Sequence, residues 1–142
     1  MASLDKELIE KKLLQLGETL QELLTFRKFT LKELKDSTAL FWSVEHGLQL
    51  AIQQMIDIGS HLLVSQNLNN IDDYSDVGRK LGKHGMVSKE LSDKLVLIIK
   101  FRNLLVHEYV KIETEQVFEI LQKHLEDVKQ FIEAIKNYLR KK

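Results

Sequence analysis

The chain has 142 residues and contains neither proline nor cysteine, and its 21 lysines and arginines balance its 21 aspartates and glutamates. This length predicts a single domain, residues 1–142, that buries roughly 68% of its unfolded surface, and the lack of cysteine excludes disulfides and thiolate metal sites. A neutral chain has no overall positive field that would attract nucleic acid nonspecifically, so any contact with nucleic acid must be local.

The start of the chain and its longest apolar run bear on its location. The first residues, Met-Ala-Ser-Leu-Asp-Lys-Glu, lack the apolar core of a secretory signal. The longest aliphatic run, Leu95 to Ile99, is far shorter than the roughly 18 residues that a membrane-spanning helix needs. We therefore expect a cytoplasmic protein without a membrane span.

Apolar residues recur at helical spacing almost throughout, which predicts an all-α protein. The first helix should end near Phe26, and its leucines line either the chain's own core or a partner helix. Thr30 followed by Glu33 resembles a capping box. A longer helix should begin by Thr38 and reach Val64.

The second half of the chain predicts three more helices. Turn-forming residues fill 67–74, after which Ser75 can cap a short helix that stops near His84. Another helix should start at Ser88 and carry the apolar run into Arg102, and a last amphipathic helix should begin at Thr114. Short connections between about five helices predict an antiparallel helical bundle.

Reactive side chains follow the apolar run directly, in the order Arg102, Asn103, His107 and Tyr109. On a straight helix Arg102 and His107 point roughly 140° apart, so they cannot converge within one regular helix. Either the helix ends or kinks near Val106, or a twofold dimer brings one chain's arginine beside the other chain's histidine.

This set of side chains suits cleavage of RNA without a metal ion. A neutral imidazole can accept the proton of a ribose 2′-hydroxyl, and a guanidinium can hold the charge that builds on the attacked phosphate. The product would be a 2′,3′-cyclic phosphate. Asn103 lies four residues before His107 and could orient the ring or the phosphate. A structural alternative is a histidine that pairs with helix-end carbonyls and an arginine in an ion pair.

A second polar seam runs along the long helix, where it either meets water or lines a cleft shared with another helix or subunit. Its members recur every three or four residues and are His46, Gln49, Gln53, Asp57 and His61. Asp57 and His61 have the spacing of a metal-binding pair, but two ligands do not make a site. We expect neither a metal centre nor a cofactor.

The order Arg-x4-His-x-Tyr, here Arg-Asn-Leu-Leu-Val-His-Glu-Tyr, resembles the signature of HepT-type HEPN proteins. The segment 56–62 resembles that family's Asp-x-x-x-His helix, and 112–117 resembles the opening of its final helix. Most of residues 40–135 corresponds, whereas the leading segment 1–34 is longer than the resemblance leads us to expect.

The resemblance implies a HEPN-like bundle and the toxin of a toxin-antitoxin system, a ribonuclease that acts without metal on an RNA substrate. It implies Arg102 and His107 as the catalytic pair, Asn103 as a polar companion, and Asp57 and His61 as supports of the cleft. It implies that an MntA-type nucleotidyltransferase antitoxin adds AMP to Tyr109, and that the chain forms a homodimer through the helices that bear the motif.

Two other functions fit the same residues. In one, the chain is a non-catalytic module that presents a nucleotide or substrate to a minimal nucleotidyltransferase, and Tyr109 only packs or binds. In the other, the chain is a structural helical adaptor with no RNA turnover.

Overall fold

The structure, a computed structural model, describes residues 4–106 and 112–142, and within them it contains seven α-helices, one 3₁₀ turn and no strand. The long helices are α1 (Lys6–Thr25), α3 (Thr38–Ser65), α5 (Lys89–Leu105) and α7 (Leu125–Arg140). The short elements are η1 (Phe26–Lys28), α2 (Leu31–Asp36), α4 (Ser75–Lys83) and α6 (Thr114–Lys123). The predicted all-α class is confirmed.

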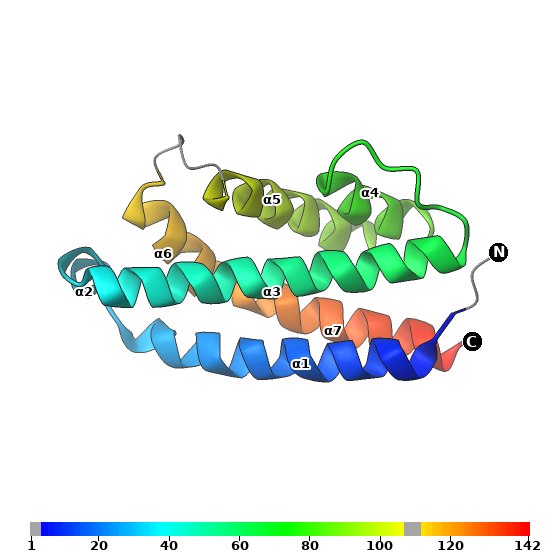
Figure 1. Cartoon of the computed structure of the whole chain (residues 1–142), viewed down its shortest axis with the longest axis horizontal. Helices are drawn as coiled ribbons and strands as arrows, with labels where there is room; N and C mark the ends of the chain where they lie inside the picture. The colour runs from blue at the N-terminus through cyan, green and yellow to red at the C-terminus, as the bar shows by residue number, and fades with distance from the viewer. Residues whose placement is uncertain (1–3, 107–111) are drawn as a thin grey trace.

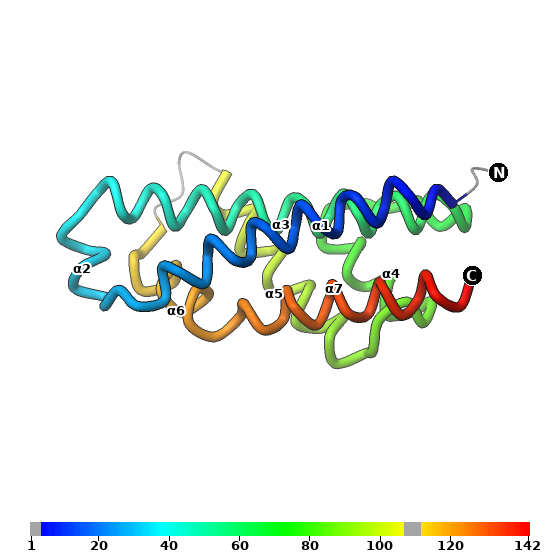
Figure 2. Tube along the Cα trace, turned by 90° about the horizontal axis from the view of Figure 1, so that it is seen from below, coloured from blue at the N-terminus to red at the C-terminus, as the bar shows by residue number. Residues whose placement is uncertain are grey.

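Successive long helices run in opposite directions, as Figure 1 shows, so that α1 and α5 point one way and α3 and α7 the other. Helix α1 packs against α3 and α7, and α5 packs against α3, α4 and α7. The view from below in Figure 2 places α1 between α3 and α7. The predicted antiparallel bundle is therefore correct, with α4 covering one end of α5.

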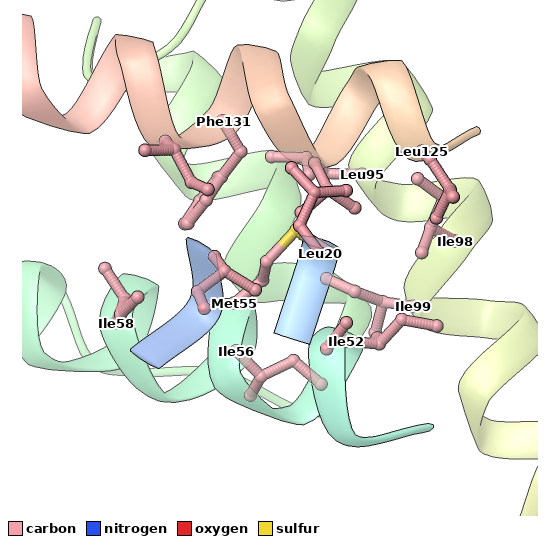
Figure 3. Packing of buried hydrophobic residues seen from close by; sticks show 14 of the residues in the cluster. Leu20, Ile52, Met55, Ile56, Ile58, Leu95, Ile98, Ile99, Leu125 and Phe131 are labelled. Atoms are coloured by element: carbon pink, nitrogen blue, oxygen red, sulfur yellow. The ribbon is translucent and has the colours of Figure 1, made fainter. Parts of the chain in front are cut away.

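One continuous core joins the four long helices (Figure 3). Leu20 of α1, Met55 of α3, Leu95 of α5 and Phe131 of α7 are all buried in it. Helical spacing brings one apolar face of each helix inward, and burial of that face is the main stabilising contribution. The leucines of α1 therefore line the chain's own core, which was one of the two predicted alternatives; the other was a partner helix.

Three of the predicted helix starts are confirmed by hydrogen bonds to backbone amides. Thr30 and Glu33 form the expected capping box, with distances of 3.1 Å and 3.0 Å. Ser37 caps α3 and Ser88 caps α5, each accepting a backbone N–H at 3.1 Å. These side chains satisfy amide groups that have no partner within the helix.

The predicted last helix is two helices, α6 and α7, which meet at His124. His124 has φ −116° and ψ 2°, and its Nδ1 lies 2.8 Å from Oδ2 of the buried Asp127. Lys94 lies 3.7 Å from the other carboxylate oxygen. Apolar periodicity did not reveal this break, because Leu125 stays buried on the same side of the bundle. This division and the separate α2 account for the excess over five helices.

None of the described helices combines the length and apolar character that a membrane crossing requires.

Helices α4 and α5 pack tightly at Gly82, where an added Cβ would lie 2.4 Å from Cβ of Ser92. We predict that Gly82→Ala lowers the free energy of unfolding by about 1–3 kcal/mol, because α4 and α5 must move apart. Gly17→Ala is the matched control, since nothing lies within 4 Å of its added Cβ. The control should raise stability by about 0.5–1 kcal/mol in urea denaturation. Equal changes in both variants would contradict this close packing.

Candidate functional site

The end of α5 carries the reactive cluster. The helix ends at Leu105 and Val106 is its C-cap, which is one of the two alternatives that the divergence of Arg102 and His107 on a regular helix left open. Arg102 and Asn103 lie in the last turn and are half-buried. His107 and Tyr109 lie outside the described residues, so the part of the site that the structure places is built around Arg102.

The Arg102 guanidinium contacts side chains from three parts of the chain. Its Nη2 donates to Oε1 of Gln53 on α3 at 2.5 Å. Its Cζ lies 5.3 Å from the centroid of the Tyr74 ring, which comes from the segment between α3 and α4. Its Nη1 approaches Oδ1 of Asn103 at 3.5 Å, which is a weak contact. A hydrogen bond and a cation–π contact thus fix the plane of the guanidinium.

These partners of Arg102 are uncharged. Among residues 4–106 and 112–142, no carboxylate lies within ion-pair distance of Arg102. Its Nε is buried and has no hydrogen-bond partner in the same part of the chain. A half-buried cation without an anionic partner retains a strong attraction for an anion. The arrangement is therefore able to bind a phosphate.

The polar seam on α3 divides into separate parts. Gln53 contacts Arg102 and also donates from Nε2 to Oδ1 of Asp57 at 2.9 Å, so Asp57 joins the site through Gln53. His61 is exposed and His46 lines a different hollow between α1 and α3, of about 650 Å³. The structure thus connects Asp57 with Arg102, whereas among the described residues no hydrogen bond or ion pair joins His61 to this group.

A hollow of about 490 Å³ opens beside Arg102. One wall is the segment before α4 and the other is the end of α5. The hollow is lined by Ile71, Asp72, Asp73, Tyr74, Arg102, Asn103 and Val106. Its volume lies within the range of about 300–1,000 Å³ that is typical of small-ligand sites.

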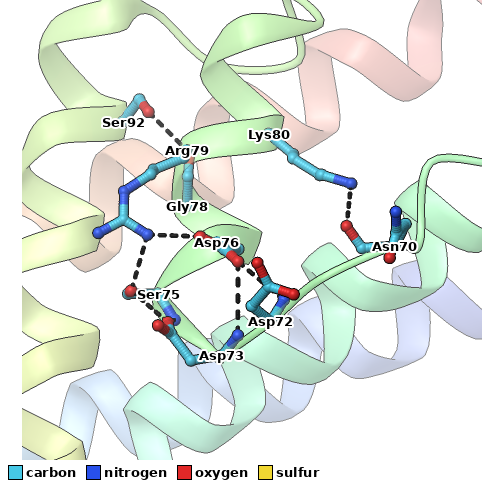
Figure 4. Close-up of polar contacts among 9 residues, drawn as sticks. All are labelled: Asn70, Asp72, Asp73, Ser75, Asp76, Gly78, Arg79, Lys80 and Ser92. Carbon is cyan, nitrogen blue, oxygen red and sulfur yellow. Dashed lines mark hydrogen bonds and ion pairs between the residues drawn. The ribbon is translucent and has the colours of Figure 1, made fainter.

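Local hydrogen bonds hold the segment that carries Tyr74 (Figure 4). Oδ1 of Asp73 accepts from the backbone N–H of Ser75 at 2.8 Å and from its hydroxyl. Oδ2 of Asp76 accepts from the N–H of Asp72 at 2.8 Å, and its other oxygen pairs with Arg79. Ser75 begins α4 but does not cap it as predicted, since its hydroxyl is bound to Asp73.

The same hydrogen bonds keep two carboxylates ionised. The bond from the Ser75 hydroxyl is the largest influence that lowers the pKa of Asp73. The backbone hydrogen bond from Asp72 is the largest influence that lowers the pKa of Asp76. Hydrogen bonds to a carboxylate favour its charged form, so these bonds extend to lower pH the range over which both groups are anionic.

The sequence did not predict that Gln53 and Tyr74 contact Arg102. Gln53 was visible only as a member of the α3 seam, and its contact with Arg102 spans 49 residues. Tyr74 was an aromatic residue at the end of a polar turn segment, a weak sign of a binding surface. Within the described ranges, no group of three or more histidine, aspartate or glutamate residues has the arrangement of a metal site.

Comparison with solved structures defines the class of the fold. The structure is similar to a tri-AMPylated HEPN toxin of Shewanella oneidensis in complex with an MNT antitoxin, with a TM-score of 0.84 and 27% sequence identity. The match covers 94% of this chain and 99% of that chain. The bundle is therefore a HEPN fold.

Sequence comparisons define the family. A family model described as Ribonuclease HepT-like matches residues 9–135. The chain is 33% identical over 104 residues to the mRNA nuclease HepT of Shewanella oneidensis, which covers 73% of this chain and 78% of the relative. It is 29% identical over 139 residues to the tRNA nuclease HepT of Aphanizomenon flos-aquae, with 98% and 95% covered. This chain belongs to the HepT-like ribonuclease family, as its Arg-x4-His-x-Tyr motif indicated, and the match includes most of α1.

Proposed function

We propose that this chain is the toxin of a toxin-antitoxin pair, an endoribonuclease that needs no metal ion and acts in the cytoplasm as one helical domain. The family and the nuclease names of its relatives support this function. The observation that carries it is the Arg102 guanidinium, which uncharged side chains hold at the edge of a hollow. No carboxylate of residues 4–106 and 112–142 pairs with this cation, and a phosphate of RNA would supply the anion.

The proposed reaction is a transfer within the RNA strand. His107 accepts the proton of the 2′-hydroxyl as that oxygen attacks the neighbouring phosphorus. Arg102 donates hydrogen bonds to the oxygens of the phosphorane, whose negative charge is greatest in the transition state. The bond to the 5′-oxygen breaks, that oxygen takes up a proton from the solvent while the imidazolium of His107 returns its proton to the solvent, and a 2′,3′-cyclic phosphate remains. Asn103 and Asp57 support the site, Asp57 through its hydrogen bond from Gln53.

We propose a twofold homodimer in which the two copies of the motif share one cleft. Arg102 and His107 point in different directions on a regular helix, and α5 ends between them at Leu105. A second copy facing this end of α5 would bring one chain's imidazole to the other chain's guanidinium. In this assembly His61 supports the cleft from the exposed side of α3.

We propose that an MntA-type nucleotidyltransferase is the antitoxin and that it adds AMP to Tyr109. A related HEPN toxin is described as tri-AMPylated and bound to an MNT antitoxin. Tyr109 lies two residues after His107 in sequence, so the added phosphates would stand near the general base. Their bulk and negative charge would exclude the phosphate of the substrate.

Substitution of the catalytic pair tests the nuclease. We predict that Arg102→Ala and His107→Ala each reduce cleavage of total RNA in the presence of a chelator by about 10²-fold or more. Arg102→Lys should also be impaired, because lysine keeps the charge but lacks the planar fork. The matched controls Arg140→Ala and His84→Ala should cleave like the unmodified chain and yield cyclic phosphate ends. Full cleavage by Arg102→Ala or His107→Ala would refute these roles.

Mass spectrometry tests the silencing. The chain expressed with its nucleotidyltransferase should gain the mass of one or more adenylates on Tyr109 and lose its nuclease activity. Tyr109→Phe should gain none and stay active, because it lacks the phenolic oxygen that accepts the phosphate. Tyr138→Phe is the matched control and should be modified normally. Adenylate on Tyr138 or Tyr74 in place of Tyr109 would contradict the assignment.

A further inference from the structure

The hollow beside Arg102 has an aromatic wall that the proposed reaction does not use. Tyr74 is 46% exposed, so its ring is accessible to a ligand. Its ring lines the hollow, and the Arg102 guanidinium lies next to it. A planar ring and a planar cation therefore stand together where the strand would pass the proposed catalytic arginine.

We propose that this hollow is a nucleobase-binding subsite in which a base stacks on an open face of the Tyr74–Arg102 pair while Asp72 and Asn103 read its edge, with guanine preferred. The inference rests on the proposed function, because it assigns the substrate preference of the same site. It adds to that function a reason for cleavage at particular positions.

Stacking accounts for the affinity of the subsite. Proteins that recognise single-stranded RNA stack unpaired bases on aromatic rings and on arginine planes. The Arg102 guanidinium lies over one face of the Tyr74 ring, so a base in this hollow of about 490 Å³ would stack on an open face of the aromatic–cation pair. The phosphate that follows the stacked base would then lie near the guanidinium of Arg102.

Polar groups at the rim account for the preference. Among the described residues the Asp72 carboxylate accepts no hydrogen bond, whereas that of Asp73 is bound to Ser75. An ionised carboxylate only accepts hydrogen bonds, and it can take two parallel N–H donors. Guanine presents two such donors, N1–H and the 2-amino group, on its Watson–Crick edge. Adenine and cytosine place a ring nitrogen acceptor beside their amino group, and uracil has one donor between two carbonyls.

Asn103 complements this carboxylate. Its Oδ1 faces Nη1 of Arg102, which leaves its Nδ2 to donate. Guanine carries a carbonyl oxygen next to its N1–H, so an amide donor and a carboxylate together match three adjacent groups on its edge.

Hydrogen bonds within the chain hold the wall that carries Tyr74. Asp73 accepts from the backbone amide of Ser75, Asp76 accepts from that of Asp72, and Lys80 donates to the backbone carbonyl of Asn70 (Figure 4). A preorganised wall loses little conformational entropy on binding. The anionic Asp72, Asp73 and Asp76 also repel phosphates, so the base of a strand enters this side of the hollow in preference to its backbone.

Binding of defined RNAs to the full chain tests the subsite. The probes are short oligouridines with a single G, inosine, A or C, each made in an all-ribose form and in a form with 2′-deoxy sugars that cannot be cleaved. The dissociation constant comes from fluorescence anisotropy with the deoxy form, and kcat/KM from cleavage of the ribose form. The probe with G should bind about tenfold more tightly than those with A or C, and inosine, which lacks the 2-amino group, should fall between them.

Substitutions assign the two kinds of contact. Tyr74→Leu should weaken binding of every probe by about tenfold, because it removes the stacking surface. Asp72→Asn should bring G and A to within about twofold of each other, because the amide replaces one acceptor with a donor. The matched controls are Tyr138→Leu, whose ring also lies beside a cation, and Asp93→Asn, an exposed carboxylate at the other end of α5. Both controls should bind like the unmodified chain.

The outcomes separate the subsite from the proposed function. Cleavage with no base preference, together with normal binding by Tyr74→Leu, would overturn the subsite and leave the nuclease intact. An unmodified chain that cleaves nothing would overturn the nuclease, and the deoxy probes would then decide the subsite through binding alone. A third outcome concerns the partner. If Tyr74→Leu and Asp72→Asn bind the RNA probes with an unchanged preference for G but no longer bind the nucleotidyltransferase, the hollow is a protein-docking surface and the subsite is wrong.

Discussion

The contact between the Arg102 guanidinium and its uncharged neighbours sets the properties of this site. A half-buried cation next to a carboxylate would be neutralised, and a fully exposed one would be hydrated and free to rotate. Gln53 and Tyr74 fix the group without cancelling its charge. The fold serves this contact, because α3 brings Gln53, α5 brings Arg102, and the segment held by Asp73 and Asp76 brings Tyr74.

The sequence predicted the parts of the structure that depend on local rules. Helical spacing of apolar residues predicted the all-α class and the core faces, and Thr30, Thr38 and Ser88 marked real helix starts. The break at His124 was missed because apolar periodicity continues through it, and the His124–Asp127 contact depends on burial that spacing does not report. The prediction that Ser75 caps α4 was wrong, because its hydroxyl donates to Asp73 and not to the start of the helix.

The sequence predicted the reactive residues of the candidate site but not the residues that position Arg102. The motif from Arg102 to Tyr109 is contiguous, so its residue types and spacing could be compared with a known family and their chemistry considered. The groups that position Arg102 come from distant segments, and only packing of α3 and the segment before α4 against α5 brings them together. The net charge of the chain is zero, so no overall positive field attracts RNA. Binding of RNA must then depend on a local cation, Arg102, and on the hollow beside it.

The most direct test replaces the uncharged partner of Arg102 with a charged one of the same shape. Gln53→Glu should retain the hydrogen-bond acceptor for Arg102 but lose the amide that donates to Asp57, so it should also lower the stability of the fold. Assayed at a temperature at which both proteins are folded, it should reduce kcat/KM for RNA cleavage by about tenfold or more, because the new carboxylate neutralises the guanidinium. Gln66→Glu, with the same charge change at the far end of α3, should cleave normally. Undiminished cleavage by Gln53→Glu would contradict the view that Arg102 acts as an uncompensated cation.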